Sequence, residues 1–160
     1  MVDTRLARRD DAEAIRTIYN HYVENTTVTF DLVPRSLQDQ QQWLEARSGA
    51  LAVVVAVDQD DEVLGFASLS PYKERPAYRT SVENSIYVAP GAERRGVGRT
   101  LMDHLIEVAT ESGYHAMMAR IADAKPASVG LHSAVGFEMV GIEREVGRKV
   151  GRWLDIAVMQ

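Results

Sequence analysis

A short stretch in the middle of the chain has the residues needed to bind a phosphate group. Residues 87–101 read YVAPGAERRGVGRTL, and a β-type run over 81–88 leads through this loop into a helical pattern. The free N–H groups and dipole of a helix N-terminus attract anions, and Gly96 and Gly98 leave the backbone open to them. Three basic side chains add positive charge: Arg94, Arg95 and Arg99. The pattern predicts a pyrophosphate site.

The glycine pair alone does not define a phosphate site. Ordinary tight turns also use two glycines, so the glycines by themselves leave both interpretations open. A P-loop requires Lys followed by Ser or Thr after its second glycine, whereas Val97 and Gly98 follow Gly96. The dinucleotide fingerprint requires a third glycine where this chain has Leu101. Both of these phosphate motifs are therefore excluded.

The first half of the chain provides strands and helices that must support this loop. A polar stretch resembling a capping box, Ser36 to Asp39, predicts the start of one helix, and Asp10 and Asp11 favour the start of an earlier one. The run 51–57 is continuously apolar, as in a strand buried on both faces. The predicted elements are strands at 2–7, 51–57 and 63–69, a helix after Asp11, and a helix from Ser36 to near Gly49.

The second half predicts a β-α-β arrangement around the glycine loop. Residues 70–80, with two prolines and two tyrosines, are typical of an irregular segment. The predicted elements are strands at 81–88, 115–121, 137–142 and 153–158 and helices at 98–112 and 126–135. Hairpins early and a β-α-β unit later indicate a mixed α/β fold.

Composition limits the class of protein. A chain of 160 residues fits one domain over 1–160, and a net charge of −5 disfavours binding to nucleic acid or to anionic membranes. The chain has no cysteine, which excludes disulfides, thiolate metal sites and a cysteine nucleophile and fits a reducing cytoplasm. His21, His104 and His115 lack metal-ligand spacing, so no metal is expected. No apolar stretch follows the first basic residues and no apolar run approaches the ~20 residues of a membrane span, so we expect neither a signal peptide nor a membrane helix.

The loop resembles motif A of the GNAT superfamily of N-acetyltransferases, written Q/R-x-x-G-x-G/A. The match is Glu93 to Gly98, after a strand and Pro90. Residues 127–137 resemble that superfamily's later helix, which ends in Gly136-Phe137. Five further segments resemble the phosphinothricin and methionine sulfoximine acetyltransferase branch: 19–22, Trp43, 72–78, 82–85 and 151–155.

The resemblance implies a GNAT-type α/β fold with a central, mostly antiparallel twisted sheet and flanking helices. It implies acetyl transfer from acetyl-CoA to the amino group of a small amino-acid-like substrate of the phosphinothricin, methionine sulfoximine or methionine sulfone type. The branch is usually dimeric, so we expect a homodimer, with Trp43 and Trp153 in the core or at the dimer contact. Glu93 and Lys125 depart from the family pattern, in which Gln or Arg and often Asn stand at these positions.

The cofactor site that the resemblance implies lies between two strands that splay apart to admit the pantetheine arm. A backbone N–H near Val88 would polarise the thioester carbonyl. The residues expected to contact acetyl-CoA are Ile86, Tyr87, Val88, Arg94, Arg95, Gly96, Val97, Gly98, Arg99, Thr100 and Lys125.

Two residues are candidates for catalysis by direct attack within a ternary complex. The chain has neither a cysteine nor a G-x-S-x-G elbow, which agrees with direct attack. Glu83 is the candidate base, although spacing alone would describe it as a solvent-facing carboxylate. His132 stands where many GNAT enzymes carry a Tyr that protonates the leaving thiolate, and a structural histidine near the surface is the competing interpretation.

Aromatic and basic residues are candidates for binding the amine. Phe30, Tyr72 and Tyr78 could enclose an apolar side chain, and Lys73 or Arg75 could pair with a carboxylate or phosphinate. A solvated loop is the competing interpretation. Two alternative functions also share the motif: acetylation of peptide or protein N-termini, and a non-catalytic acyl-CoA-binding sensor.

Overall fold

The computed structural model describes residues 1–47 and 49–160. Its strands are β1 (Asp3–Leu6), β2 (Val53–Val57), β3 (Val63–Pro71), β4 (Ser81–Val88), β5 (Ala116–Ala122), β6 (Met139–Lys149) and β7 (Arg152–Met159). They form one sheet in the order β1-β2-β3-β4-β5-β7-β6. Among these described strands only the central pair β4–β5 is parallel, and the other neighbours are antiparallel. The prediction of a mostly antiparallel α/β fold is confirmed.

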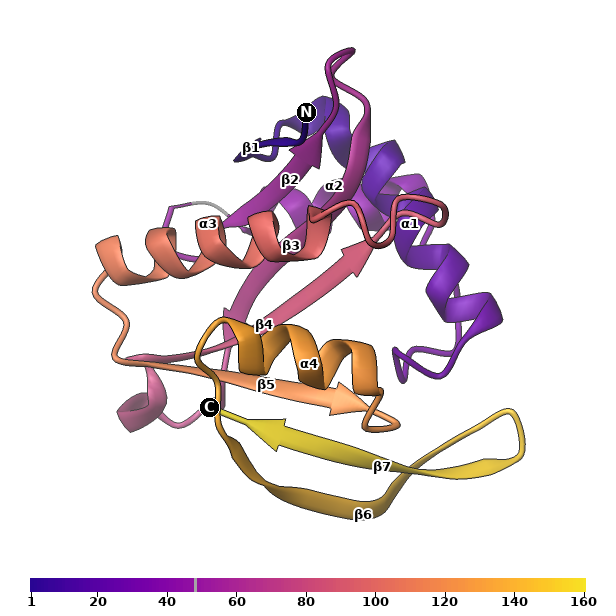
Figure 1. Ribbon diagram of the computed structural model, residues 1–160, viewed down its shortest axis with the longest axis vertical. Helices are drawn as coiled ribbons and strands as arrows, with labels where there is room; N and C mark the ends of the chain where they lie inside the picture. The colour runs from indigo at the N-terminus through magenta and orange to yellow at the C-terminus, as the bar shows by residue number, and fades with distance from the viewer. Residues whose placement is uncertain (48) are drawn as a thin grey trace.

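Helices cover both faces of this sheet (Figure 1). The helices are α1 (Ala12–Asn25), α2 (Leu37–Glu45), α3 (Val97–Glu111) and α4 (Pro126–Ala134), with short 3-10 turns at Arg9–Asp11 and Pro76–Tyr78. α1 and α2 pack on one face, and α3 and α4 pack on the other. No helix in the described ranges is long and apolar enough to cross a membrane.

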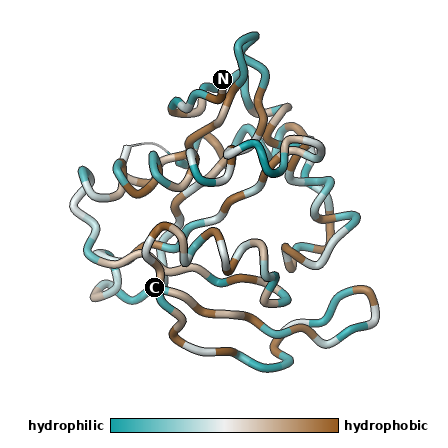
Figure 2. Tube along the Cα trace, in the orientation of Figure 1, coloured by the Kyte–Doolittle hydropathy of each residue, from teal (hydrophilic) through white to brown (hydrophobic). Residues whose placement is uncertain are grey.

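The run of valines in β2 explains why this strand lies inside the sheet. All five of its residues are buried. Val53, Val55 and Val57 pack under α1 and α2, while Val54 and Ala56 pack under α3. A strand with helices on both faces needs apolar side chains at every position, and the hydropathy trace shows this unbroken apolar stretch (Figure 2).

The starts of the first two helices follow their capping residues. In α2, the Asp39 N–H donates to Ser36 Oγ (3.1 Å) and the Ser36 N–H donates to the Asp39 carboxylate (3.4 Å), which confirms the capping box. The Asp11 carboxylate accepts the Arg8 N–H (2.6 Å) and so caps the 3-10 turn that precedes α1. α2 ends at Glu45, earlier than the predicted end near Gly49.

The last hairpin is longer than the sequence indicates. The predicted strand 137–142 is wrong at its end, because β6 continues to Lys149. A register irregularity between Glu143 and Gly147 lets a polar stretch stay in the strand. Within it Glu145 has φ 53°, and its N–H donates to the Asp155 carboxylate (2.9 Å). Because strands are predicted from apolar patterns, the charged residues of this stretch conceal its strand character.

The parallel pair β4–β5 separates halfway along its length. Its register runs from Ser81 beside Ala116 to Asn84 beside Ala119 and then stops. β4 continues to Val88 and β5 to Ala122 without further pairing to each other. The two strands therefore splay apart after Asn84, as the family resemblance implied, and the opening lies next to the glycine loop.

Candidate active site

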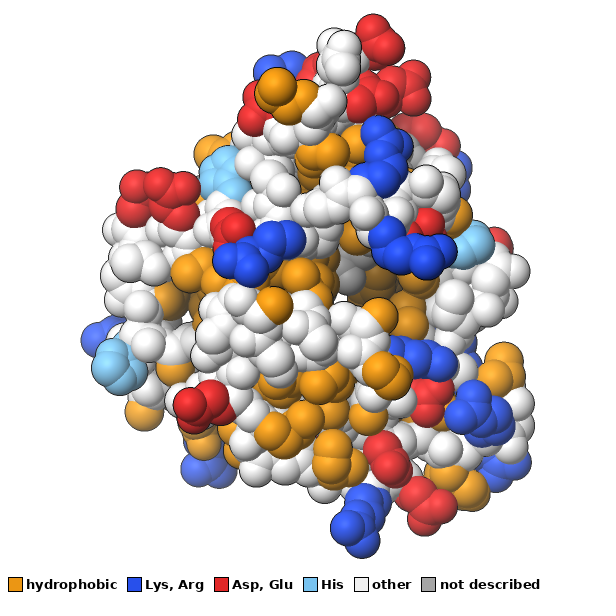
Figure 3. Space-filling model, viewed as in Figure 1, with side chains coloured by type: hydrophobic (Ala, Val, Ile, Leu, Met, Phe, Trp, Pro, Cys, Tyr) orange, Lys and Arg blue, Asp and Glu red, His pale blue; other side chains and the backbone are white. Residues whose placement is uncertain are grey.

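A cavity of about 480 Å³ fills the opening between β4 and β5. Its walls are the second half of each strand, the loop after β4 and the first turns of α3 and α4. Figure 3 shows this face hollowed beside the N-terminal ends of α3 and α4, with Lys and Arg side chains around the opening. The volume is in the range of small-molecule sites. The predicted residues that line it are Ile86, Tyr87, Val88, Arg94, Gly96, Val97, Gly98, Arg99, Lys125 and His132.

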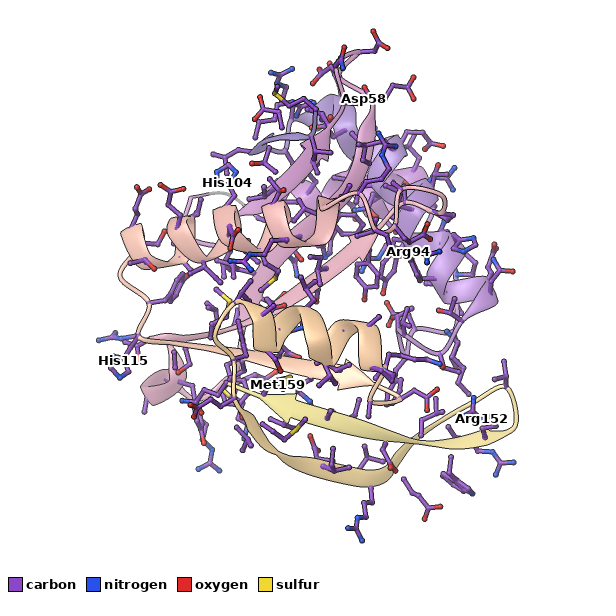
Figure 4. All side chains as sticks on the ribbon, in the orientation of Figure 1. Asp58, Arg94, His104, His115, Arg152 and Met159 are labelled. Atoms are coloured by element: carbon purple, nitrogen blue, oxygen red, sulfur yellow. The ribbon has the colours of Figure 1, made fainter. Side chains whose placement is uncertain are left out.

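The glycine loop has the geometry of an anion cradle. Gly96 has φ 80° and precedes the first residue of α3, so its left-handed conformation directs the chain into the helix. A Cβ at Gly98 would lie 3.2 Å from Leu131 Cδ2, so there is little room for a side chain between α3 and α4. Arg94 belongs to this loop (Figure 4) and lines the cavity. Helix N–H groups, an open backbone and a cation thus converge on the end of the cavity.

Several predicted cofactor residues have partners within the protein. The Arg99 Nε donates to Asp103 (2.9 Å) and its Nη1 to the Ala134 carbonyl (3.1 Å), although Arg99 lines the cavity. The Lys125 Nζ lies 3.0 Å from Asp123 Oδ2. Two predicted residues are not among those lining the cavity: Arg95 and Thr100. The Thr100 hydroxyl instead donates to the Gly96 carbonyl (3.0 Å).

Glu93, which departs from the family pattern, has a hydrogen-bond partner for its carboxylate. Its carboxylate accepts the Gly91 N–H (2.7 Å), a contact within the loop itself. Glu93 also lines the cavity, and its charge raises the pKa of Tyr22, after the larger effect of burial. The acid therefore stabilises the turn before the cradle.

Backbone groups of β4 face the gap. Val88 is beside Gly65 of β3, and the N–H of the next residue, Ala89, donates to the carbonyl of Leu64 in β3 (2.8 Å). Because successive residues of a strand direct their N–H and C=O groups to opposite sides, those of Val88 point away from β3 and toward the gap. The Val88 carbonyl accepts the Tyr22 hydroxyl (2.5 Å), and its N–H remains as a donor on the same side.

His132 is buried, so the interpretation as a surface histidine is wrong. Its side chain lines the cavity and lies against Asn84, the last residue of the paired part of β4. The Nδ1 atom is 2.7 Å from the Ser128 carbonyl and Nε2 is 2.9 Å from Asn84 Oδ1. The Asn84 amide is held in this orientation because its Nδ2 donates to the Met118 carbonyl (3.1 Å).

Both ring nitrogens of His132 thus face oxygen acceptors, so both contacts are hydrogen bonds only when the imidazole carries two protons. Burial acts in the opposite direction and lowers the pKa of His132, while the hydrogen bond to Ser128 raises it. The contacts favour the protonated ring and burial favours release of a proton, which is the combination a proton donor needs.

Glu83 lies on the other face of the sheet from His132. It alternates with Asn84 along β4, and its neighbour in β3 is Ser70. Burial raises the pKa of Glu83, Arg120 lowers it and Glu143 raises it. Its side chain makes no hydrogen bond or ion pair with the residues described in the structure. A basic, available carboxylate therefore stands beside the splay point.

Phe30 belongs to a segment that is hydrogen-bonded to β6. The Lys149 ammonium donates to the Thr29 carbonyl (2.9 Å) and the Asp31 carbonyl (3.0 Å). The Phe30 ring lies on Gly147, where a Cβ would come within 2.1 Å of the ring. The α1–α2 connection thus meets the last hairpin, and it joins the two helices that cover the Glu83 face of the sheet.

The remaining predicted amine-binding residues form a separate exposed group. The rings of Tyr72 and Tyr78 meet edge to face, 5.6 Å apart, and Lys73 lies about 5 Å from both. Arg75 occupies the N-cap position of the 3-10 turn that follows, without a capping hydrogen bond from its side chain. This segment precedes the first residue of β4, whereas the cavity lies along the strand's second half. The structure does not bring these side chains to the cavity of their own chain.

Several cavity residues were not predicted from the sequence. They are Tyr22, Val28, Asn84, Ser85, Ala92, Ala119, Arg120, Ile121, Ala122, Ala127, Ser128 and Leu131. The small residues at the end of β5 were a signal, because they leave space beside β4. The contact between Asn84 and His132 joins positions 48 residues apart, and nothing local predicts it.

The comparisons with known proteins agree with this geometry. A family model described as Acetyltransferase (GNAT) domain matches residues 4–158. A phosphinothricin N-acetyltransferase of Streptomyces coelicolor is 42% identical over 159 residues, with 98% of this chain and 93% of the relative covered. An L-methionine sulfoximine/L-methionine sulfone acetyltransferase of Pseudomonas paraeruginosa is 40% identical over 151 residues, covering 94% and 88%.

A solved structure shares the whole architecture. It is a GNAT superfamily phosphinothricin acetyltransferase from Sinorhizobium meliloti in complex with AcCoA. The TM-score is 0.95 and the identity 37%, with 99% of this chain and 86% of the other covered. The match extends over both halves of the sheet and the elements around the cavity. This chain therefore belongs to the GNAT family of acetyltransferases.

Proposed function

We propose that this protein moves an acetyl group from acetyl-CoA to the amino group of a small amino-acid-like substrate of the phosphinothricin, methionine sulfoximine or methionine sulfone type. We further propose that residues 1–160 form one catalytic domain. The observation that carries the proposal is the cavity in the β4–β5 opening, which ends at the glycine cradle. The names of the relatives support the class of amine.

In this proposal the splayed strands separate two half-sites. Acetyl-CoA supplies the acetyl thioester when bound, with its pyrophosphate at the cradle of Gly96 and Gly98 and its pantetheine arm between β4 and β5. The Val88 N–H is placed to donate to the thioester carbonyl. The amine approaches from the opposite face, where Glu83 accepts its proton directly or through a water.

The leaving thiolate needs a proton, and the candidate donor lies on the cofactor face of the sheet. His132 holds a proton between Asn84 and Ser128 and lines the cavity, so we propose that it protonates the thiolate. Base and acid thus stand on opposite sides of the gap, which suits direct attack within one ternary complex. Catalysis then depends on positioning both substrates.

The Phe30 contact gives a prediction for the amine site. Gly147→Ala places a methyl group where the Phe30 ring lies, so the ring or the strand must move. We expect the KM for the amine to rise about tenfold, which corresponds to about 1.4 kcal/mol. The KM for acetyl-CoA should stay within about twofold, because neither Gly147 nor Phe30 lines the cavity.

Gly141→Ala is the matched control for this substitution, since no atom lies within 4 Å of its Cβ position on the same strand. Steady-state kinetics with each substrate varied in turn provides the measurement. Equal amine KM values for the two variants would exclude Phe30 from the amine site.

The proposed reaction is tested by thiol release from acetyl-CoA across a panel of amines. The panel contains phosphinothricin, methionine sulfoximine, methionine sulfone, common amino acids and short peptides. The chain has no cysteine, so protein thiols add no background. We expect release with the first three compounds. Thiol release only with peptides would overturn the proposed substrate class. Binding of acetyl-CoA without thiol release in the presence of any amine would indicate a non-catalytic acyl-CoA-binding sensor.

We also propose a homodimer that uses the outer hairpin. Trp43 packs against the core, whereas Trp153 is 58% exposed, which excludes the core position considered for it. Four apolar side chains of β6 are exposed with it: Met139, Val140, Ile142 and Val146. The Tyr72, Lys73 and Tyr78 group closely follows Ser70, the β3 neighbour of Glu83, so its role in amine binding does not depend on a second copy and stays a prediction. Light scattering after size-exclusion chromatography tests whether the protein is a dimer, and Trp153→Ser should weaken that dimer. A cytoplasmic location stays a prediction.

A further inference from the structure

Three charged side chains cross the amine face of the sheet on three strands. Glu83 is on β4, Arg120 on β5 and Glu143 on β6. The Arg120 Nη2 lies 2.8 Å from Glu143 Oε1, and Arg120 also lines the cavity. Only Glu83 was singled out from the sequence.

The strand registers place these residues on one face. Glu83 is beside Met118, and Arg120 follows Met118 by two residues, so Glu83 and Arg120 share a face. Arg120 is beside Val158 of β7, and Val158 is beside Gly141 of β6. Glu143, two residues beyond Gly141, therefore reaches Arg120 across β7.

The charge of Arg120 acts on two carboxylates, those of Glu83 and Glu143. In the described structure Arg120 forms an ion pair only with Glu143. The pair with Glu143 is half-exposed on both sides, with side chains 38% and 41% accessible. Glu83 has no ion pair within the described part of the chain, although the charges of Arg120 and Glu143 both act on it. On the β3 side the neighbour of Glu83 is Ser70, whose hydroxyl accepts Arg47 Nη2 (3.0 Å).

We propose that Glu143 is a positioning residue that holds Arg120 away from Glu83 and so keeps this carboxylate free and basic for the incoming amine. A direct pair between Arg120 and Glu83 would make Glu83 a weaker base and would occupy the oxygens that must accept the proton. Glu143 prevents this by accepting the guanidinium itself. The proposal rests on the proposed function of Glu83.

The charges predict shifts of opposite sign in the pH profile. In Glu143→Gln, Arg120 acts on Glu83 without compensation, so the acid limb of kcat/KM should move to lower pH. In Arg120→Gln the favourable charge is lost, so the limb should move to higher pH. The rate at mildly acid pH, relative to the alkaline plateau, should rise in the first variant and fall in the second, each by roughly two- to tenfold.

Two further variants separate this effect from general damage. The double variant E143Q/R120Q removes both charges, so its limb should lie between those of the single variants. Glu13→Gln breaks an exposed ion pair with Arg16 and should leave the profile unchanged. A purely structural ion pair would shift both single variants alike or neither, and that result would overturn the proposal.

A spectroscopic titration distinguishes this proposal from the proposed function. The side-chain carboxyl carbon of Glu83 can be followed by NMR in the glutamate-labelled protein, with Glu83→Gln used to assign its signal. We expect its titration midpoint to fall in E143Q and rise in R120Q, whether or not the amine panel shows turnover. Unchanged midpoints would refute the role of Glu143 even in an active enzyme.

Discussion

Replacing Glu83 by glutamine is expected to lower kcat by about 10²–10⁴-fold, the usual contribution of a positioned general base. An amino group arrives as an ammonium and must lose a proton before it attacks. Burial raises the pKa of Glu83, which makes it a stronger base than an ordinary surface carboxylate, with Arg120 opposing and Glu143 adding to this effect. Glutamine keeps the shape but accepts no proton at neutral pH.

The pH profile provides the sign of this effect. Below the raised pKa, Glu83 is protonated and cannot act as a base, so the native kcat/KM should rise with pH through that pKa and level off above it. This limb should be absent in Glu83→Gln. Titration calorimetry should give the same acetyl-CoA affinity for both proteins, because Glu83 does not line the cavity.

A matched control for Glu83 is Glu107→Gln, which neutralises an exposed carboxylate on α3. Its kcat and pH profile should equal those of the native protein. If Glu83→Gln retained the native rate and the native acid limb, the base would be a different group, and the proposed division of the site into two faces would lose its main support.

Local sequence signals predicted most of the elements. β4 begins and ends at the predicted residues 81 and 88, because turn residues bound an apolar alternating run. The Ser36 capping box was predictable because its two hydrogen bonds join residues three apart. The end of β6 was predicted wrongly for the opposite reason, since its pairing with β7 depends on the backbone of another strand and not on its own charged side chains.

The cradle was predictable and the two catalytic neighbourhoods were not. Gly96 and Gly98 form a local motif, whose geometry depends on one strand, one loop and one helix. The Asn84 contact of His132 and the pairing of Arg120 with Glu143 depend on how distant strands are arranged in the sheet. The sequence shows which residues can titrate, but only the tertiary structure shows which charges surround them.

The predicted amine-binding residues show the same difference between residue types, which the sequence gives, and positions, which depend on the tertiary structure. Phe30 was chosen for its aromatic ring, and its contact with Gly147 joins the α1–α2 connection to the last hairpin. The Tyr72 group was chosen on the same grounds and follows Ser70, the β3 neighbour of Glu83, and neither it nor Phe30 lines the cavity. Residue type alone does not show these positions, because they depend on the contact of Phe30 with β6 and on the pairing of β3 with β4.

The second large effect is expected at the cradle, where Gly98→Val should raise the Kd for acetyl-CoA at least about 100-fold, or about 2.7 kcal/mol. Gly98 is in the first turn of α3 and lines the cavity, and a Cβ there would already lie 3.2 Å from Leu131 Cδ2 and 3.8 Å from Val88 Cγ2. The two methyl groups of valine would cover the N–H groups that a pyrophosphate must approach.

Stability and binding can be separated in this test. Valine has a higher helix propensity than glycine, which offsets part of the crowding against Leu131, so the melting temperature should change by only a few degrees. Gly130→Ala on α4 is the control: no atom lies within 4 Å of its Cβ position, and it should keep native affinity while gaining up to about 1 kcal/mol of stability. Titration calorimetry measures the affinities. A Kd for Gly98→Val within about threefold of native would show that the phosphates bind elsewhere, since no approach to this backbone would then be needed.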